Sequence, residues 1–348
     1  MTEAAAEIRF LQFRDSPIGF GVSGDGPPLV AAAWWVSHLE LDWQDDAFRS
    51  FWGSVASSNS LVRYDHPGFG LSGRDLAAAR LTLDDEVGLL GAVMDELGLE
   101  RASLVGGSSG GCAAIAFAAR FPERVDRLLL YGTYAYGRAL APAGVREAMV
   151  TAVRSHWGLG SRMLAEGFLG DASTDERERF VRRQRESADA ETAAALLELT
   201  YELDVRGELA RVRAPTQIVH RRGDRAIPHA CGLELAASIP GARLVTLEGS
   251  AHLPWVGDRM SVARALGSFL SAPEAAASSP DPAAAMLLSR REREVLSLVA
   301  LGLSDREIAE RMIVSPHTVH RHVANIRRKL GSNSRAAAIA EAARVGLL

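Results

Sequence analysis

Short apolar runs alternate with helical patterns through most of the chain. Each run is six to eight residues long and rich in Val, Leu, Ile and Ala, which is typical of strands buried on both faces of a sheet. The runs occupy residues 27–34, 60–65, 102–107, 127–133, 216–221 and 242–249. Between them, 82–98 and 111–120 carry apolar positions at helical spacing, and 8–22 predicts a hairpin with its turn near 15–17. Strands that alternate with helices predict an α/β domain with a largely parallel sheet.

Two segments depart from this alternation of strands and helices. Residues 134–210 are helical by pattern and rich in Arg, Glu and Ala, so we predict a helical cap inserted into the sheet domain. Residues 271–286 are rich in Ala, Ser and Pro and lack the large apolar side chains that order a segment, so they predict a linker. We therefore expect a first domain over 1–270 and a second over 287–348.

The second domain contains three helix-start signals. Ser289 precedes an amphipathic stretch, and Ser304 is followed three residues later by Glu307, which is the capping-box spacing. Ser315 is a third candidate cap, with Pro316 in the first turn. Two helices, a short turn and another helix predict a helix-turn-helix domain.

Charge separates the two domains. Residues 287–348 carry a net charge of +5, and the rest of the chain carries −9. A small basic domain on a larger acidic body predicts a polyanionic partner for the basic domain alone.

Several classes of protein are excluded by what the sequence lacks. No run approaches the ~18 apolar residues that span a membrane, and the first residues lack the basic start and apolar core of a signal peptide. The two cysteines, Cys112 and Cys231, form neither a disulfide framework nor a metal-ligand spacing. We expect a cytoplasmic protein without a metal or cofactor.

A glycine-rich turn carries the candidate chemistry. Residues 104–111 read LVGGSSGG, so both Ser108 and Ser109 satisfy Gly-x-Ser-x-Gly. A strand runs into these glycines and a helix follows, which is the context that a nucleophile elbow requires. Asp224 and His252 each follow a later predicted strand, so the order along the chain is Ser, Asp, His.

Residues 8–270 resemble the α/β-hydrolase family. The resemblance is carried by LVGGSSGG, GDRAIP, GSAHLPW, RYDHPGFGLS and FPERVDRLLL. In the family's register Ser108 is the nucleophile and Ser109 supplies an oxyanion N–H; in the alternative register Ser109 is the nucleophile. His252 would be the general base and Asp224 the residue that orients it.

The chain departs from the family pattern after its first central strand. The family has His-Gly close to the oxyanion, and this chain has AAAWWVSH, which puts Trp34 or Trp35 there. We expect the backbone of Trp35 to supply the second oxyanion N–H, and Trp34, Trp35, Ser108 and His252 to contact a bound ligand. For three aromatic residues of the cap, Trp157, Phe168 and Tyr201, the alternatives are pocket lining and packing, and we expect each to be buried by packing.

The third helix of the second domain has one apolar and one polar face. Its polar face predicts a surface for the major groove of DNA and its phosphates. The last 62 residues resemble the LuxR-type helix-turn-helix, through LSRREREVL, GLSDREIAERM, SPHTVHRHVANIRRKLG and SNSRAAAIA. The resemblance implies DNA binding as a homodimer. The expected DNA-binding residues are Thr318, His320, Arg321, Ala324, Arg328 and Lys329.

The sequence therefore supports three functions. The first is a transcription regulator that senses a small molecule with its hydrolase-like domain and binds promoter DNA with the other. The second is a serine hydrolase of esters, lactones or amides that carries a DNA-binding domain, and it is favoured by the complete Ser-Asp-His set. The third, a transcription factor whose large domain only dimerises, has no use for that set.

Overall fold

An eight-stranded mixed sheet organises the first domain in the computed structural model. The structure describes residues 7–74, 81–272, 288–312, 314–330, 332, 334–344 and 347. The spatial order of the strands is β1-β2-β4-β3-β5-β6-β7-β8. Their bounds are β1 Glu7–Phe13, β2 Ser16–Ser23, β3 Pro28–Ala32, β4 Ser60–Tyr64, β5 Ala102–Gly107, β6 Val125–Tyr131, β7 Thr216–Arg221 and β8 Arg243–Leu247.

The predicted strands and the parallel sheet are confirmed. All six apolar runs form strands, β3 to β8, and they pair in parallel. The predicted hairpin is β1 and β2, which pair antiparallel with each other, and β2 pairs antiparallel with β4. Its turn lies at Arg14 and Asp15, both with positive φ, rather than at 15–17, because β2 already begins at Ser16.

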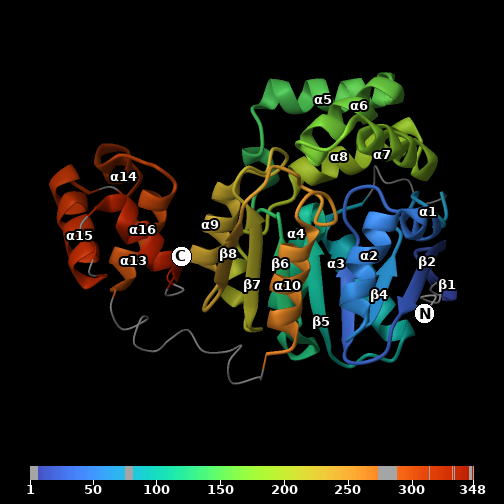
Figure 1. The fold of residues 1–348 in the computed structure, drawn as a ribbon, viewed down its shortest axis with the longest axis horizontal. Helices are drawn as coiled ribbons and strands as arrows, with labels where there is room; N and C mark the ends of the chain where they lie inside the picture. The colour runs from blue at the N-terminus through green and yellow to red at the C-terminus, as the bar shows by residue number, and fades with distance from the viewer. Residues whose placement is uncertain are drawn as a thin grey trace.

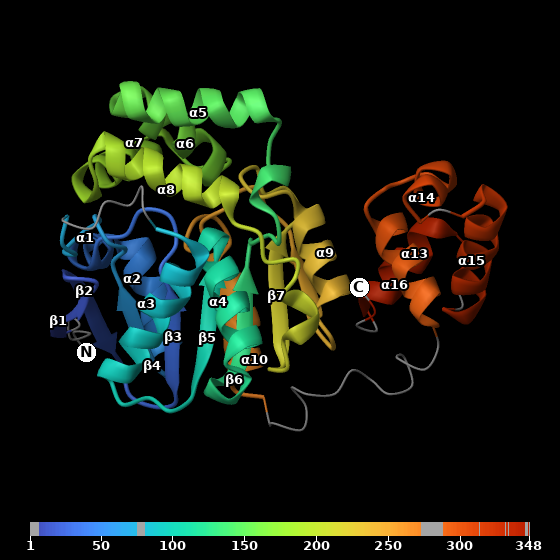
Figure 2. The same cartoon turned by 180° about the vertical axis from the view of Figure 1, so that it is seen from behind.

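Helices cover both faces of the sheet, which explains why the strands are apolar throughout (Figures 1 and 2). One face is covered by α3 (Leu83–Glu96), α4 (Ser108–Arg120) and α9 (His229–Ser238). The other is covered by α2 (Asp46–Ala56) and α10 (Arg259–Leu270). The short α1 (Leu39–Gln44) and three 3₁₀ turns, Pro122–Arg124, Gly137–Ala139 and Leu209–Arg211, lie in connections.

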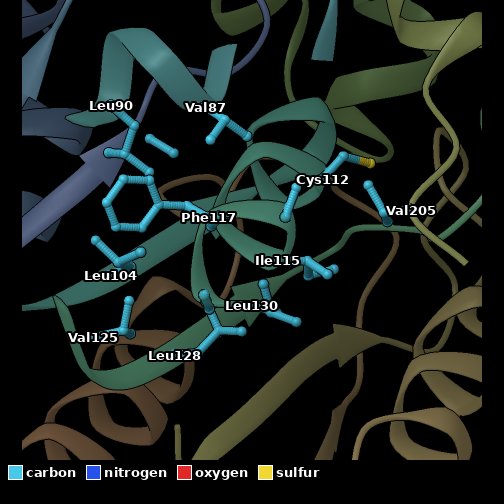
Figure 3. Close-up of a cluster of buried hydrophobic side chains, with 14 of the residues drawn as sticks. Val87, Leu90, Leu104, Cys112, Ile115, Phe117, Val125, Leu128, Leu130 and Val205 are labelled. Atoms are coloured by element: carbon cyan, nitrogen blue, oxygen red, sulfur yellow. The ribbon is translucent and has the colours of Figure 1, made fainter. Parts of the chain in front are cut away.

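Helix α4 is the most deeply buried helix of the first domain. Every residue from Ser108 to Ala119 is buried, and its many Ala and Gly residues let it lie close against the sheet. Phe117 and Ile115 pack on Leu104 of β5 and Leu128 of β6 (Figure 3). The start of α4 is therefore held rigidly at the end of β5.

The cap consists of four helices above the carboxyl edge of the parallel strands (Figure 1). They are α5 Ala143–Ser155, α6 Trp157–Leu169, α7 Thr174–Ser187 and α8 Ala190–Glu202, within the predicted span of 134–210. Side chains of the cap share one hydrophobic cluster with α2, α10 and that face of the sheet. The cap is therefore packed onto the first domain.

The second domain is a four-helix unit with its own core. Its helices are α13 Arg290–Ala300, α14 Asp305–Met312, α15 Pro316–Lys329 and α16 Arg335–Arg344. Ser289 and Ser315 cap α13 and α15, and Ser304 bonds with Glu307, as predicted. All but two residues of the predicted linker, 271–286, lie outside the described residues.

The two domains touch along α9 (Figures 1 and 2). Ala300 and Leu301, at the end of α13, pack against the hydrophobic cluster of the first domain, as do Cys231 and Ala236 of α9. Within the described ranges no helix combines the length and the apolarity needed to cross a membrane.

Candidate active site and DNA-binding surface

Three strands end beneath the cap, and each leads to one of the predicted triad residues. Ser108 directly follows β5, Asp224 lies three residues after β7, and His252 lies five residues after β8. All three residues are more than nine-tenths buried. Parallel strands bring their carboxyl ends to one edge of a sheet, so the topology gathers residues that are 144 positions apart in the sequence.

The turn at Ser108 has the geometry of a nucleophile elbow. Ser108 has a φ of 51°, which non-glycine residues rarely adopt. A Cβ atom on Gly106 would lie 2.7 Å from the Cα of Gly111, and one on Gly110 would lie 2.5 Å from the carbonyl oxygen of Ala33. The other register, with Ser109 as the nucleophile, also requires glycines. The lack of space for side chains therefore does not identify which serine is the nucleophile. The positive φ of Ser108 does favour Ser108, because nucleophile elbows are strained at the nucleophile.

The second and third triad residues are joined by a hydrogen bond. His252 Nδ1 lies 2.8 Å from Asp224 Oδ2. A carboxylate can only accept, so Nδ1 carries the proton, and in the neutral imidazole Nε2 then presents its lone pair. Burial alone would raise the pKa of Asp224, but the charge and hydrogen bond of His252 lower it below its ordinary value. Asp224 is therefore ionised at neutral pH and can stabilise a protonated His252.

The base nitrogen of His252 is not hydrogen-bonded to Ser108 in this structure. Its Nε2 is buried and has no hydrogen-bond partner among the described residues. The backbone N–H of His252 donates to the carbonyl of Phe168 in the cap, at 2.7 Å, and the two rings lie 5.4 Å apart. The cap thus contacts the candidate base directly.

The two tryptophans after β3 have different surroundings. The ring of Trp34 lies against Gly107 and makes edge contacts with Trp52, Tyr131 and Trp255. Trp35 points toward the cap, where its Nε1 donates to Gln184 Oε1 at 3.1 Å. Gln184 Nε2 in turn donates to the carbonyl of Ser161. Trp34 therefore packs inside the first domain and Trp35 connects that domain to the cap.

The cleft has two cavities that meet at Ser108 and Trp35. The larger, about 200 Å³, lies under the cap and is also lined by Ser109. The smaller, about 40 Å³, is lined by all four residues predicted to contact a ligand, Trp34, Trp35, Ser108 and His252. Ser109 is the second residue of α4, so its N–H has no intrahelical acceptor, as an oxyanion donor requires. The oxyanion roles of Ser109 and Trp35 stay predictions.

All three cap aromatic residues pack against the core as predicted, and two of them also line the larger cavity. Trp157, Phe168 and Tyr201 are partly buried against the hydrophobic cluster that the cap shares with the first domain. Trp157 Nε1 donates to the carbonyl of Ala188. Phe168 and Tyr201 also line the larger cavity, which was the alternative role. An apolar helix face looks the same in the sequence whether it meets side chains or a cavity, so the sequence does not separate these roles.

Arg221 is a residue that the sequence reasoning missed. It is the last residue of β7, is 1% exposed, and donates to four backbone carbonyls of the loop that holds His252. The acceptors are Ala251 at 2.8 Å, Leu253 at 3.1 Å, Asp258 at 3.3 Å and Pro254 at 3.4 Å. Arg221 therefore fixes the chain on both sides of His252. An arginine at the end of a buried apolar run was the signal for it.

The exposed face of α15 agrees with the predicted DNA-binding surface. Val319 and Ile326 are buried against the rest of the domain. Among the predicted residues, the exposed ones are His320, Arg321, Ala324 and Arg328.

Four of the predicted DNA-binding residues have partners within the domain. Arg328 donates to Asn325 Oδ1 of the same helix at 3.1 Å. Lys329 Nζ lies 2.7 Å from Glu292 of α13, an ion pair that joins the two helices. His320 lies 3.3 Å from Asp305 of α14. The hydroxyl of Thr318 lies 2.8 Å from that of the helix cap Ser315. The contacts of these residues with DNA stay predictions.

Comparisons with known proteins match both domains. The family model described as alpha/beta hydrolase fold matches residues 56–256, and the model described as bacterial regulatory proteins, luxR family, matches 286–342. A 2-hydroxymuconate semialdehyde hydrolase of Pseudomonas sp. (strain CF600) is 31% identical over 290 residues, which cover 78% of this chain and 94% of the relative. A pimeloyl-[acyl-carrier protein] methyl ester esterase of Stenotrophomonas maltophilia (strain K279a) is 28% identical over 72% of this chain and 95% of its own.

A solved structure agrees with the fold. The crystal structure of a hydrolase from Pseudomonas aeruginosa PA01 has a TM-score of 0.65 and 26% identity, and covers 77% of this chain and all of its own.

No group of three or more His, Cys, Asp or Glu residues that could hold a metal occurs within the described residues.

We expect a fluorophosphonate probe to add once to the wild-type chain and to Ser109→Ala, and not to Ser108→Ala. The reason is that Ser108 occupies the strained turn beside His252. Intact-protein mass spectrometry measures the adduct. Labelling of Ser108→Ala but not of Ser109→Ala would assign the nucleophile to Ser109, and a folded wild type without adduct would contradict an activated serine.

Replacing Arg221 with Met should slow the labelling of Ser108 by at least about tenfold, because a buried carbonyl without its donor costs about 1–3 kcal/mol and the His252 loop shifts to find new partners. Arg221→Lys should recover part of the rate, since an ammonium can donate to up to three of the carbonyls. The matched control is Arg222→Met, whose side chain is 63% exposed and pairs with Glu248. Equal labelling rates in folded Arg221→Met and wild type would show that the loop does not depend on Arg221.

Proposed function

We propose a function from two family assignments. The chain belongs to the α/β hydrolase fold family, and its last domain belongs to the luxR family of bacterial regulatory proteins. The protein is a DNA-binding transcription regulator whose first domain senses a small molecule. The ligand binds in the cleft between cap and sheet, and the second domain binds promoter DNA as a homodimer in the cytoplasm.

One observation carries this proposal, namely that the wall of the larger cavity continues into the helix that touches the DNA-binding domain. Arg225, Ala226 and Ile227 line that cavity and lead directly into α9. α9 in turn contacts α13, where Leu301 packs against the first domain's cluster. A ligand that displaces residues 225–227 therefore acts on an element in contact with the second domain.

The same short segment is attached to the candidate triad. Asp224 Oδ1 accepts hydrogen bonds from the backbone N–H of Ala226 at 2.9 Å and of Ile227 at 3.0 Å. Its Oδ2 accepts from His252. A change in the protonation or position of His252 therefore alters the hydrogen bonds of Asp224, and through them the backbone that leads into α9. This is a differential contact of the kind that a ligand needs to shift a conformational equilibrium.

A serine hydrolase that carries a DNA-binding domain is the second candidate. The observation that favours it is the bond between His252 and Asp224 beside a Ser108 with positive φ. Relatives named as a semialdehyde hydrolase and a methyl ester esterase support the same chemistry. In such a reaction His252 would take the proton of Ser108 as that hydroxyl attacks a carbonyl. Both functions hold together if hydrolysis of the ligand ends its signal.

Arg321→Ala should weaken binding to a duplex selected from a random pool by about 5- to 150-fold, because a good contact of arginine with a base is worth about 1–3 kcal/mol. Fluorescence anisotropy at fixed salt measures the affinity, since phosphate contacts make it depend on salt. The control Arg291→Ala removes an exposed arginine of α13 and should change affinity less than twofold. If both variants bind alike, α15 does not read the groove.

Occupying the cleft should change the affinity for the same duplex at least threefold, and Leu301→Glu should abolish that change. The covalent fluorophosphonate adduct on Ser108 serves as the occupant, so the fraction modified is known by mass. A charge at position 301 disrupts the packing of α13 on the first domain.

The matched control for this experiment is Met260→Glu. It adds the same charge at a 61% exposed apolar position of α10 and should keep the full response. A response that survives in Leu301→Glu, or one that is absent from the labelled wild type, contradicts coupling through α9.

A further inference from the structure

We propose that His320 recognises an amino-bearing base, adenine or cytosine, in the major groove, because Asp305 and Arg335 fix which nitrogen of its ring carries the proton. The inference rests on the proposed function, since it names what one residue of the DNA-binding domain recognises. It is carried by a chain of hydrogen bonds that runs from α16 through α14 to α15.

His320 lies where a helix-turn-helix domain contacts the edges of bases. It is the fifth residue of α15, within the N-terminal half of the helix that contacts bases in such domains, and its side chain is 74% exposed. α15 lies on the side of the second domain away from the first domain (Figures 1 and 2), so the first domain leaves it uncovered. The ring of His320 is therefore placed to contact a base.

The orientation of the Asp305 carboxylate is fixed by Arg335. Asp305 is the first residue of α14, and its Oδ1 accepts from Nη1 of Arg335, the first residue of α16. Nη2 of the same guanidinium donates to the carbonyl of Leu303 at 2.6 Å, which holds the guanidinium beside the start of α14. A guanidinium has donors only, so the atom of residue 305 that faces Arg335 must be an acceptor. The second oxygen, Oδ2, is left for α15.

The second oxygen of Asp305 fixes the proton of His320. Oδ2 lies 3.3 Å from His320 Nδ1. A carboxylate can only accept, so Nδ1 carries the proton, and in the neutral imidazole Nε2 is then an acceptor. No described residue bonds to Nε2. His320 therefore presents a hydrogen-bond acceptor on the exposed face of α15, and Asp305 and Arg335 are positioning residues.

An acceptor in the major groove distinguishes amino bases from keto bases. Adenine N6 and cytosine N4 are the donors there, whereas guanine and thymine present acceptors. Two acceptors that face each other both lose hydration without gaining a partner. Of the other exposed residues predicted to bind DNA, Arg321 and Arg328 have donors only, and Ala324 has neither donor nor acceptor. His320 therefore supplies the acceptor that these three side chains lack.

The chain offers an isosteric variant that reverses this polarity and leaves His320 in place. In Asp305→Asn the amide oxygen must face Arg335, because the guanidinium only donates, so the amide NH₂ faces His320. Nδ1 then accepts, the proton moves to Nε2, and the ring presents a donor, which suits guanine O6 or N7 and thymine O4. Glu310→Gln is the matched control, since it makes the same change from carboxylate to amide at an exposed residue of α14 whose partner is Arg306.

The first test determines the base that His320 recognises. The full-length wild type and variants select duplexes from a random pool at about pH 8, where free histidine is neutral, and the selected pools are sequenced. The position that His320 recognises is the one whose base preference His320→Ala removes. We expect the wild type and Glu310→Gln to favour adenine or cytosine there at least threefold over guanine and thymine, and Asp305→Asn to favour guanine or thymine.

Three results of this selection overturn the proposal. They are a keto base favoured by the wild type at that position, an unchanged preference in Asp305→Asn, and the lack of any position altered in His320→Ala. A wild type that selects no sequence contradicts the proposed DNA binding itself, and the inference with it, so the two failures are distinguishable.

The second test measures the tautomer without DNA, so it also covers a variant that no longer binds. Nitrogen NMR of the full-length chain with isotope-labelled histidine rings, at the same pH, distinguishes protonated from unprotonated ring nitrogens. The signals of His320 are those lost in His320→Ala. We expect the proton on Nδ1 in the wild type and in Glu310→Gln, and on Nε2 in Asp305→Asn. A wild-type ring with its proton on Nε2, or the same tautomer in Asp305→Asn as in the wild type, overturns the proposal.

Discussion

The carboxylate of Asp224 is the interaction on which the rest of the site depends. One oxygen accepts from His252, and the other accepts from the two backbone amides that begin the path to α9. A buried carboxylate is stable only where such donors replace its hydration. The residue that orients the candidate base thus also holds the backbone segment that leads from the cleft to α9. The candidate base and the contact of α9 with α13 therefore depend on the same carboxylate.

The loop of His252 is held from two sides. From the sheet, the guanidinium of Arg221 binds carbonyls before and after His252; from the cap, the carbonyl of Phe168 accepts the N–H of His252. Trp35 and Gln184 make a second link between sheet and cap. The cap is therefore part of the site rather than a cover over it, and a ligand that moves Phe168 moves the base.

The sequence predicted most of the fold, and physical reasons explain which features of the fold and of the candidate site it missed. Strands buried on both faces are apolar throughout, and helix caps such as Ser289 are local, so both can be recognised within a few residues of sequence. Interactions between residues far apart in the sequence leave no such local pattern. The pairing of Lys329 with Glu292 spans 37 positions and that of Trp35 with Gln184 spans 149. Arg221 stands out in the sequence as a charged residue at the end of a buried apolar run, but the sequence does not show that its partners are backbone carbonyls on both sides of His252.

The positive φ of Ser108 lowers the folding stability of the protein. A non-glycine residue in the left-handed region costs about 1–3 kcal/mol, against a total folding stability of about 5–15 kcal/mol for a typical domain. Glycine at this position would be free of that cost. Keeping a serine rather than a glycine at the end of β5 therefore costs the fold a measurable fraction of its stability.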